Sequence, residues 1–268
     1  MTRIKIAGAS LNQVPLDWEN NISNISAAIG EARRQGVQLL CLPELCITGY
    51  GCEDAFLSDW VSVTAWDKLM VIAPLCTDMI VCVGLPLRIL GKTYNGACVI
   101  ENGKILGISL KQNLAKEGVH YEPRWFEAWK PGQVIDIQLG TGTVRAGDLT
   151  YETQGIRFGF EICEDAWSPN RPGKALYKRG VDLILNPSAS HFALGKAPRR
   201  EKEVIIDGSE AFHCIYLFVN HLGNEAGRMI YDGDVVIGQH GELLAVNNRL
   251  SFKPYTLLAL TVDTDNID

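Results

Sequence analysis

The sequence predicts a layered α/β fold, because apolar strands alternate with helices and the same order of elements occurs twice. Each half runs strand, helix, strand, helix, and then a succession of strands. A repeated order of this kind favours two sheets packed face to face with helices outside, which is a four-layer αββα sandwich of two pseudo-repeated halves. At 268 residues the chain is long enough to bury a sizeable core.

The first half carries the clearer periodic patterns. Residues 4–10 are typical of a buried strand, and the spacing of Ile22, Ile25 and Ile29 predicts a helix over residues 20–34. The remaining expected elements of this half are strands at 37–42, 80–85, 94–100 and 104–110, and a helix at 59–76 that is interrupted near Pro74. An Asn-Gly pair between the last two strands predicts a hairpin turn.

The second half repeats this order after a long connection. Its expected elements are strands at 155–162, 181–185, 215–220, 234–239, 242–246 and 255–262, and helices at 173–179 and 197–212. The connection, residues 112–154, is rich in proline, glycine and tryptophan and is expected to be irregular. Loops of this length are usually functional, as a lid or a subunit contact. Because no low-complexity linker is present, residues 1–268 are expected to form one domain.

The composition excludes several classes of partner. Lysine and arginine number 25 against 31 acidic residues, and the net charge of −6 disfavours nucleic acid or an anionic membrane as the main partner. No apolar run approaches the ~20 residues of a membrane span, and the first residues lack the apolar region of a signal peptide. We therefore expect a cytoplasmic protein. Its eight cysteines contain no CxxC pair and are expected to act as small hydrophobic residues rather than as disulfides.

A residue whose side chain can take part in catalysis follows each of three predicted strands. Glu44 follows the second strand, Lys111 follows the strand at 104–110, and Cys163 follows the strand at 155–162. A thiol attacks as the thiolate, so it needs a base or a cation nearby, and these three residues supply a base, a cation and a nucleophile. Taken singly, each has a structural alternative, namely a solvated loop acid, a surface lysine and a buried cysteine.

With these three residues in this order, the sequence resembles the nitrilase (carbon–nitrogen hydrolase) superfamily, whose Glu-Lys-Cys triad is carried on an αββα sandwich. The resemblance covers nearly the whole chain. Four longer strings look like the amidase domain of glutamine-dependent NAD synthetases: LPELCITGYGCED at 42–54, FEICEDAW at 160–167, NPSASHF at 186–192 and NEAGRMIYDG at 224–233.

The resemblance implies hydrolysis of the side-chain amide of glutamine to glutamate and ammonia. Glu44 would take the proton of Cys163, whose thiolate would attack the amide carbon and form a thioester. Lys111 and the backbone N–H of Glu164 would hold the oxyanion. Glu44 would then protonate the ammonia and activate water. This reaction requires no metal and no other cofactor.

The resemblance also implies a second glutamate and a substrate pocket. Glu122 is assigned as the second glutamate, with Glu117 as the competing candidate. The residues expected to line the pocket are Tyr50, Trp167, Ser188 and Ser190. The two aromatic residues could equally belong to the core, and the two serines could simply form a turn.

The sequence departs from a complete NAD synthetase in one respect. The pyrophosphate-binding Ser-Gly-Gly-x-Asp-Ser string of the ATP-dependent synthetase domain does not occur. The chain is therefore expected to pass ammonia to a synthetase domain or subunit, or else to be a free-standing amidase of the ω-amidase or aliphatic type. Family members assemble, so a homo-oligomer is expected.

Other classes of function find less support. The chain contains neither a GxGxxG string opening a helix nor a GxxxxGK[ST] loop, which disfavours a nucleotide site. The spacing of His191, His213 and His221 does not match a zinc motif, so no metal site is expected. A partner-binding scaffold that has lost its chemistry would not need to keep the complete triad.

Overall fold

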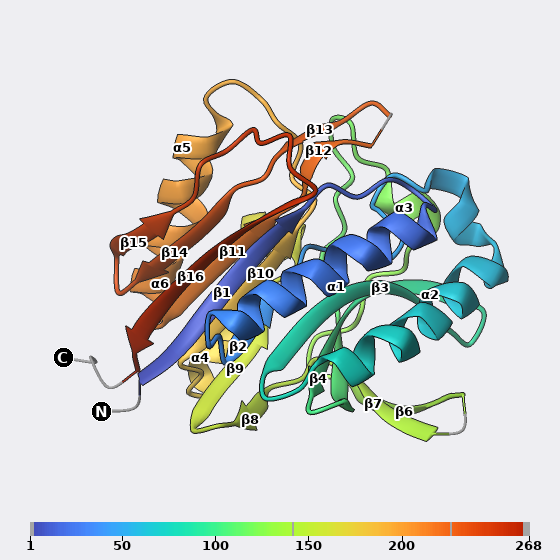
Figure 1. The fold of residues 1–268 in the computed structure, drawn as a ribbon, viewed down its shortest axis with the longest axis horizontal. Coiled ribbons are helices and arrows are strands. Elements are labelled where there is room, and N and C mark those ends of the chain that lie inside the picture. Colours follow the sequence, from blue (N-terminus) through green and yellow to red (C-terminus); the bar gives the residue numbers. More distant parts are fainter. Residues whose placement is uncertain (1–2, 141, 226, 265–268) are drawn as a thin grey trace.

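The computed structural model describes residues 3–140, 142–225 and 227–264, and its main feature is a pair of stacked mixed sheets (Figure 1). The first sheet has eight strands in the order β16 (Tyr255–Asp263), β1 (Arg3–Leu11), β2 (Leu39–Cys41), β3 (Ile80–Ile89), β4 (Lys92–Glu101), β5 (Lys104–Leu110), β7 (Gly142–Gly147) and β6 (Val134–Leu139). The second sheet has six strands in the order β15 (Glu242–Val246), β14 (Val235–Gln239), β11 (Ile215–Asn220), β10 (Leu183–Ser188), β9 (Ile156–Phe160) and β8 (Tyr151–Thr153). A short ladder joins β12 (Leu222–Asn224) to β13 (Ile230–Asp232).

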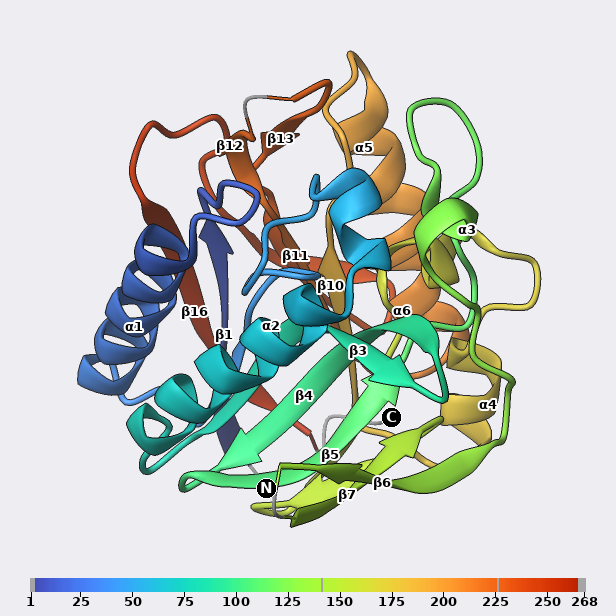
Figure 2. The same cartoon turned by 90° about the vertical axis from the view of Figure 1, so that its right-hand side faces the viewer.

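Helices cover the outer face of each sheet. The first sheet is covered by α1 (Trp18–Arg34) and α2 (Asp59–Ile72), and the second by α4 (Gly173–Lys178), α5 (Lys196–Arg200) and α6 (Asp207–Ala211). In Figure 2, α1 lies toward the left and α4 toward the right, with strands of both sheets between them. The short segments are η1 (Glu53–Leu57), η2 (Ala73–Leu75), α3 (Glu122–Trp125), η3 (Cys163–Trp167) and the π-helical η4 (Glu201–Ile206).

Three apolar layers hold this arrangement together. Between the two sheets, Ile6 and Leu39 of the first pack in one cluster with Phe158 and Leu217 of the second. The other two layers lie between each sheet and its helices. Helix α1 shows the cause, because its apolar positions recur every three or four residues and the side chain of Asp17 caps its first turn by accepting the N–H of Asn20 at 3.3 Å. The expected four-layer αββα sandwich is confirmed.

Three expectations about the fold were wrong in detail. The last strand, β16, does not finish the second sheet but pairs antiparallel with β1 along its whole length, from Arg3–Asp263 to Leu11–Tyr255. The connection 112–154 is not wholly irregular, since it contains α3, β8 and the β6–β7 hairpin. The helix expected over 197–212 is divided into α5, a π-helical turn and α6.

Two further observations bear on the expectations from composition. No helix in the described part of the chain is long and apolar enough to cross a membrane. All eight cysteines are buried free thiols.

Helix α2 is apolar on its outer side as well, where Trp60, Val63 and Val71 are each more than half exposed.

Candidate active site

Strand ends of both sheets converge on one buried cluster. Glu44 follows β2, Lys111 follows β5 and Cys163 follows β9, so each side chain enters the cluster from a rigid element. The Lys111 ammonium lies between two carboxylates, with Nζ 2.6 Å from Glu44 Oε1 and 2.8 Å from Glu122 Oε1. All three of these side chains are completely buried. The structure therefore brings Glu122, rather than Glu117, into contact with the lysine.

Both carboxylates have further partners that fix their orientation. Glu44 accepts hydrogen bonds from Asn95 Nδ2 at 2.7 Å and from the backbone N–H of Ala189 at 2.9 Å. Glu122 accepts hydrogen bonds from the hydroxyl of Tyr50 at 2.7 Å and from the backbone N–H of Ala115 at 2.8 Å. A carboxylate held by three donors cannot rotate freely, so the cluster is preorganised.

The electrostatics of the cluster suit Glu44 to the role of a base. Burial raises the pKa of the Glu44 carboxyl, an effect that Lys111 opposes and the neighbouring charge of Glu122 supports. Burial alone would lower the pKa of Lys111, but the charges of Glu122 and Glu44 outweigh it and hold that pKa well above its usual range. Lys111 is thus a permanent cation beside a carboxylate that binds protons more readily than a solvated one.

The charges of the same cluster act on the thiol of Cys163. Burial raises the pKa of its thiol, and the charge of Glu44 raises it further while that of Lys111 lowers it. The thiol is therefore protonated at rest and needs a base to become a nucleophile. Its backbone has a φ of +49°, in the left-handed region that is unfavourable for a residue with a side chain. Strain of this kind is concentrated at functional sites, where the surrounding structure maintains it.

Asp165 is one residue that maintains the turn at Cys163. Its carboxylate accepts the backbone N–H of Ile162 at 2.9 Å and that of Asn113 at 2.7 Å. One side chain thereby ties the segment that carries Cys163 to the segment that follows Lys111. The position of the thiol relative to the ammonium is set by this bridge.

The turn that carries Glu44 is fixed in another way. Leu45 has a φ of +52°, and the backbone of this turn lies directly against Gly84 of β3. A Cβ placed on Gly84 would lie 2.3 Å from the backbone nitrogen of Leu45 and 2.6 Å from the carbonyl oxygen of Pro43. On the other side, His221 Nε2 lies 2.5 Å from the carbonyl oxygen of Glu44.

Replacing Gly84 with alanine will displace the Glu44 turn, because both atoms that meet the new methyl group belong to the backbone. We expect a loss of about 1 to 3 kcal/mol in the free energy of unfolding from overpacking. We also expect a fall of roughly 10²-fold in kcat, since a displacement near 1 Å is enough for this. Thermal denaturation and ammonia release measure the two effects. Gly30→Ala is the control, because its Cβ would meet only the flexible end of Arg34 at 3.6 Å. Equal stability of the two variants would contradict the prediction.

A cavity of about 550 Å³ opens next to Cys163. Of the residues predicted from the sequence, Cys163, Glu164, Trp167, Ser190 and Glu117 line it. The other lining residues are Ala115, His120, His191, Ala193, Leu194, Gly195, Lys196 and Arg199. The cavity is thus cationic on the side formed by residues 191–199.

Two residues predicted to line the pocket lie elsewhere. Tyr50 is buried beside the cluster and contacts Glu122. Ser188 is buried at the end of β10 and donates its hydroxyl to Asn186 Oδ1 at 2.6 Å.

Several residues of the site were not foreseen from the sequence. Asn95 lies in the middle of an apolar strand, and a polar residue in that position was the signal available for it. Lys196 is mostly buried, and burial lowers its pKa. It lies beside Arg199 in a segment that the sequence presents as an ordinary charged helix start. The ring centroids of His120 and His191 lie 5.1 Å apart. Because 71 positions separate these residues in the sequence, no local pattern predicts the contact.

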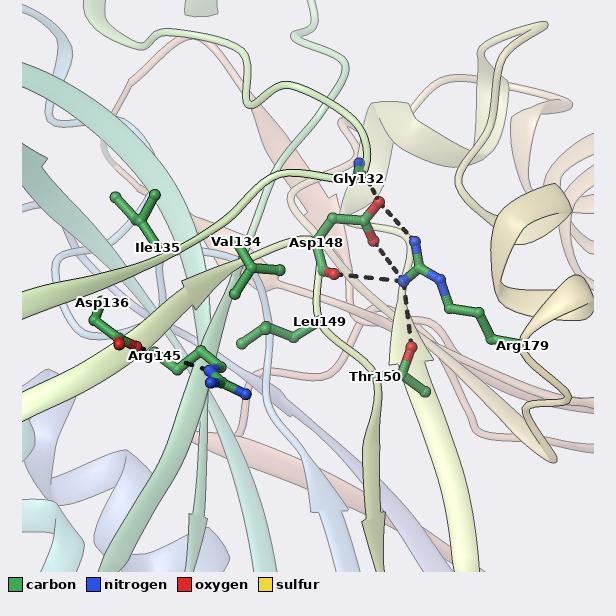
Figure 3. A pocket seen from close by; sticks show the side chains of 9 residues that line it. All are labelled: Gly132, Val134, Ile135, Asp136, Arg145, Asp148, Leu149, Thr150 and Arg179. Carbon is green, nitrogen blue, oxygen red and sulfur yellow. Dashed lines mark hydrogen bonds and ion pairs between the residues drawn. The ribbon is translucent and has the colours of Figure 1, made fainter.

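A second hollow, of about 580 Å³, lies between the β6–β7 hairpin and the end of α4 (Figure 3). Both of its arginines are paired, since Arg179 Nη1 lies 2.8 Å from Asp148 Oδ1 and Arg145 Nε lies 3.7 Å from Asp136 Oδ1. Figure 3 shows the pairs at opposite ends of the hollow with Val134 and Leu149 between them. The Arg145–Asp136 pair lies across the two strands of the hairpin, the Arg179–Asp148 pair joins the end of α4 to the residue that follows β7, and neither pair offers a ligand an uncompensated charge. Among the described residues, no group of three or more His, Cys, Asp or Glu side chains could hold a metal ion.

Comparison with known proteins agrees with this geometry. The carbon-nitrogen hydrolase family model matches residues 5–265, and the chain therefore belongs to the carbon–nitrogen hydrolase family. Within that family it is related to glutamine-dependent NAD(+) synthetases. The mouse glutamine-dependent NAD(+) synthetase is 34% identical over 280 residues, which are 99% of this chain and 38% of the mouse protein.

Solved structures give the same relation. The crystal structure of a glutamine-dependent NAD(+) synthetase from Cytophaga hutchinsonii has 52% identity and a TM-score of 0.91, and the match covers 97% of this chain and 43% of that one. The chain thus spans less than half the length of the synthetases it matches. An amidase from Nesterenkonia sp. AN1, at 21% identity and a TM-score of 0.79, covers 100% of this chain and 93% of its own, and it shares the fold.

Proposed function

We propose that this chain hydrolyses the side-chain amide of L-glutamine to glutamate and ammonia through a thioester on Cys163. The observation that carries the proposal is the buried cluster in which one ammonium joins Glu44 to Glu122 beside a strained cysteine. The relation to glutamine-dependent NAD(+) synthetases supports glutamine as the amide. The reaction needs no metal and no cofactor, because base, nucleophile and oxyanion contacts all come from protein groups.

The first half of the reaction forms the thioester. Glu44 takes the proton from the thiol, and the sulfur of Cys163 forms a bond to the amide carbon. The oxyanion that develops lies against Lys111 and the backbone N–H of Glu164. Glu164 is the second residue of the short helix η3, so its N–H has no partner earlier in that helix. Such contacts are each worth several kcal/mol in a buried site. Glu44 then gives its proton to the departing nitrogen, and ammonia leaves.

The second half regenerates the enzyme. Glu44 takes a proton from water, the hydroxide attacks the thioester, and the sulfur leaves and is protonated again. One base thus shuttles protons in both halves. The role of Glu122 in this scheme is to keep the ammonium of Lys111 in place through the 2.8 Å contact, so that the cation faces the developing charge.

The cavity offers groups for the other end of glutamine. The ammonium of Lys196 is the mostly buried cation of its lining, and we assign it to the α-carboxylate of the substrate. Ser190 and Trp167 line the same space, and Arg199 stacks over the ring of Trp167 at 5.4 Å. Glu164 and Glu117 are the carboxylates of the lining that are available to an α-ammonium group.

The ammonia is proposed to serve the synthesis of NAD from deamido-NAD. A synthetase domain or subunit would receive it, since the synthetases related to this chain are more than twice as long as the matched part. The expected homo-oligomer stays a prediction.

Ammonia release from a panel of amides tests the proposed substrate. We expect kcat/KM for L-glutamine to exceed that for butyramide and propionamide by roughly 10²-fold or more, because these lack the charged groups that pair with the cavity. The chain is assayed alone and again with a synthetase domain from a related protein. A preference for a simple aliphatic amide, or for an ω-amide without the α-ammonium group, would replace glutaminase with a free-standing amidase.

A further inference from the structure

A chain of hydrogen bonds leads from the buried cluster to the cavity. The Tyr50 hydroxyl lies 2.7 Å from Glu122 Oε1 and 3.0 Å from His120 Nδ1. The other ring nitrogen of that histidine, Nε2, lies 3.0 Å from His191 Nδ1. His120 and His191 both line the cavity, so the chain starts at a completely buried carboxylate and ends at the substrate space.

The three side chains between Glu122 and the cavity, Tyr50, His120 and His191, are neutral at rest. Burial lowers the pKa of His120 to about 3, and the nearby His191, Lys111, Lys196 and Arg228 act in the same direction. Burial and Lys196 lower the pKa of His191, and burial raises that of Tyr50. Lys196 Nζ lies 3.2 Å from both Nδ1 and the carbonyl oxygen of His191. A neutral imidazole has one N–H and one acceptor nitrogen. The hydrogen bonds of Tyr50, His120 and His191 can therefore all donate toward Glu122 or all donate toward the cavity.

The proposed reaction produces a proton that needs such a route. Glutamine and water yield a carboxylic acid and ammonia, and the acid, with a pKa near 4.3, ionises at neutral pH. Ammonia that leaves as a neutral nucleophile does not remove this proton. One proton per turnover therefore remains among buried groups after the thioester is hydrolysed, and Glu44 is the base next to it.

We propose that Tyr50, His120 and His191 conduct this proton from the buried carboxylates to the cavity, an inference that rests on the proposed hydrolysis of an amide. Lys111 takes the proton from Glu44 as it gives one of its own to Glu122. Glu122 then protonates the oxygen of Tyr50, whose own proton passes to His120 Nδ1.

The last two transfers complete the route. His120 gives its Nε2 proton to His191 Nδ1, and His191 releases its Nε2 proton to water in the cavity. Each member gains one proton and loses one, so the net result is one proton moved outward and Glu44 ionised again. The Tyr50 hydroxyl then resets by rotation, and each imidazole, now protonated at Nδ1, returns to its Nε2–H form by exchanging a proton with water in the cavity, with no net proton moved along the hydrogen bonds.

The variant His191→Gln tests this route in the full chain. Glutamine keeps a side chain that can accept from His120, but it has no second nitrogen that passes a proton on. We expect the first turnover to release its equivalent of ammonia normally, because the surplus proton arises only after the thioester forms. Steady-state kcat should fall by at least about tenfold and KM should fall with it, so that kcat/KM stays within about twofold, because the slowed step follows ammonia release. Free imidazole at high concentration should restore kcat in the variant and leave the unchanged protein unaffected.

A second variant and a control keep the outcomes separate. His120→Gln should behave like His191→Gln, so the proposal does not depend on the folding of one variant. His213→Asn removes an exposed histidine outside the chain and should change nothing, with or without imidazole. An unchanged kcat in both chain variants, a loss that imidazole does not restore, or loss of the first ammonia release would each overturn the proton route. Failure of the unchanged protein to hydrolyse glutamine would instead reject the proposed substrate, and the same test would be run with the amide it does accept.

Discussion

Cys163→Ala will retain no more than about one ten-thousandth of the rate of ammonia release, because no other group on the route can form the thioester. The fold should be unaffected, since alanine fills part of the same space in a turn that Asp165 and the strand β9 hold. Circular dichroism and thermal denaturation check the fold, and a coupled ammonia assay checks the rate. Glutaminase activity above that level in the variant would show that the mechanism is wrong.

Alkylation provides an independent measurement of the same residue. The other seven cysteines are buried in strands, helices or turns away from the cavity, and Cys163 is the thiol that lines it. Iodoacetamide should therefore label Cys163 first in the folded protein, and glutamine should slow the labelling. Equal labelling of several cysteines, located by peptide mass spectrometry, would remove the argument for a special thiol.

Glu122→Gln will lower kcat by roughly 10²-fold, the range found when one contact to a developing charge is removed. Glu122 accepts hydrogen bonds at both oxygens, from Lys111 and Tyr50 at one and from the Ala115 N–H at the other. Glutamine offers one acceptor oxygen, so its NH₂ group must face a donor on one side. Lys111 also loses one of its two counter-charges and is held less firmly.

Glu117→Gln is the matched control for this prediction. Glu117 belongs to the lining of the same cavity but is exposed, and no contact joins it to Lys111. Its replacement should leave kcat within about threefold and act on KM if at all, because Glu117 lies in the cavity lining and not against Lys111. Separate kcat and KM values for both variants decide the assignment. A large loss with Glu117→Gln and a small one with Glu122→Gln would exchange the roles of the two residues.

The parts of the site that the sequence could predict are those at strand ends. Glu44, Lys111 and Cys163 each follow an apolar run, and such a run is a local pattern that predicts a strand. Their partners are not local. Asn95 reaches Glu44 from another strand, and Tyr50 reaches Glu122 across 72 positions of sequence. No periodicity reports such contacts, because they depend on how the sheets and connections pack.

The errors in the fold have a similar cause. The run at 134–139 is partly exposed and lies at the edge of its sheet, so its apolar residues give a weak strand signal. The placement of β16 is a matter of tertiary pairing. Its sequence fits either sheet, and only the partner β1 decides between them. The helical pattern at 197–212 correctly indicated helix but could not show the π-helical turn inside it.

The pairing of β1 with β16 has a consequence for the newly made chain on the ribosome. Strand β1 (Arg3–Leu11) is synthesised well before β16 (Tyr255–Asp263), its partner on one side. At bacterial or eukaryotic elongation rates, that side of β1 stays without its partner for roughly 10 to 50 s. An unpaired strand edge is a template for association with other chains. We therefore expect the nascent protein to be most prone to association at this edge of β1 until translation reaches residue 263.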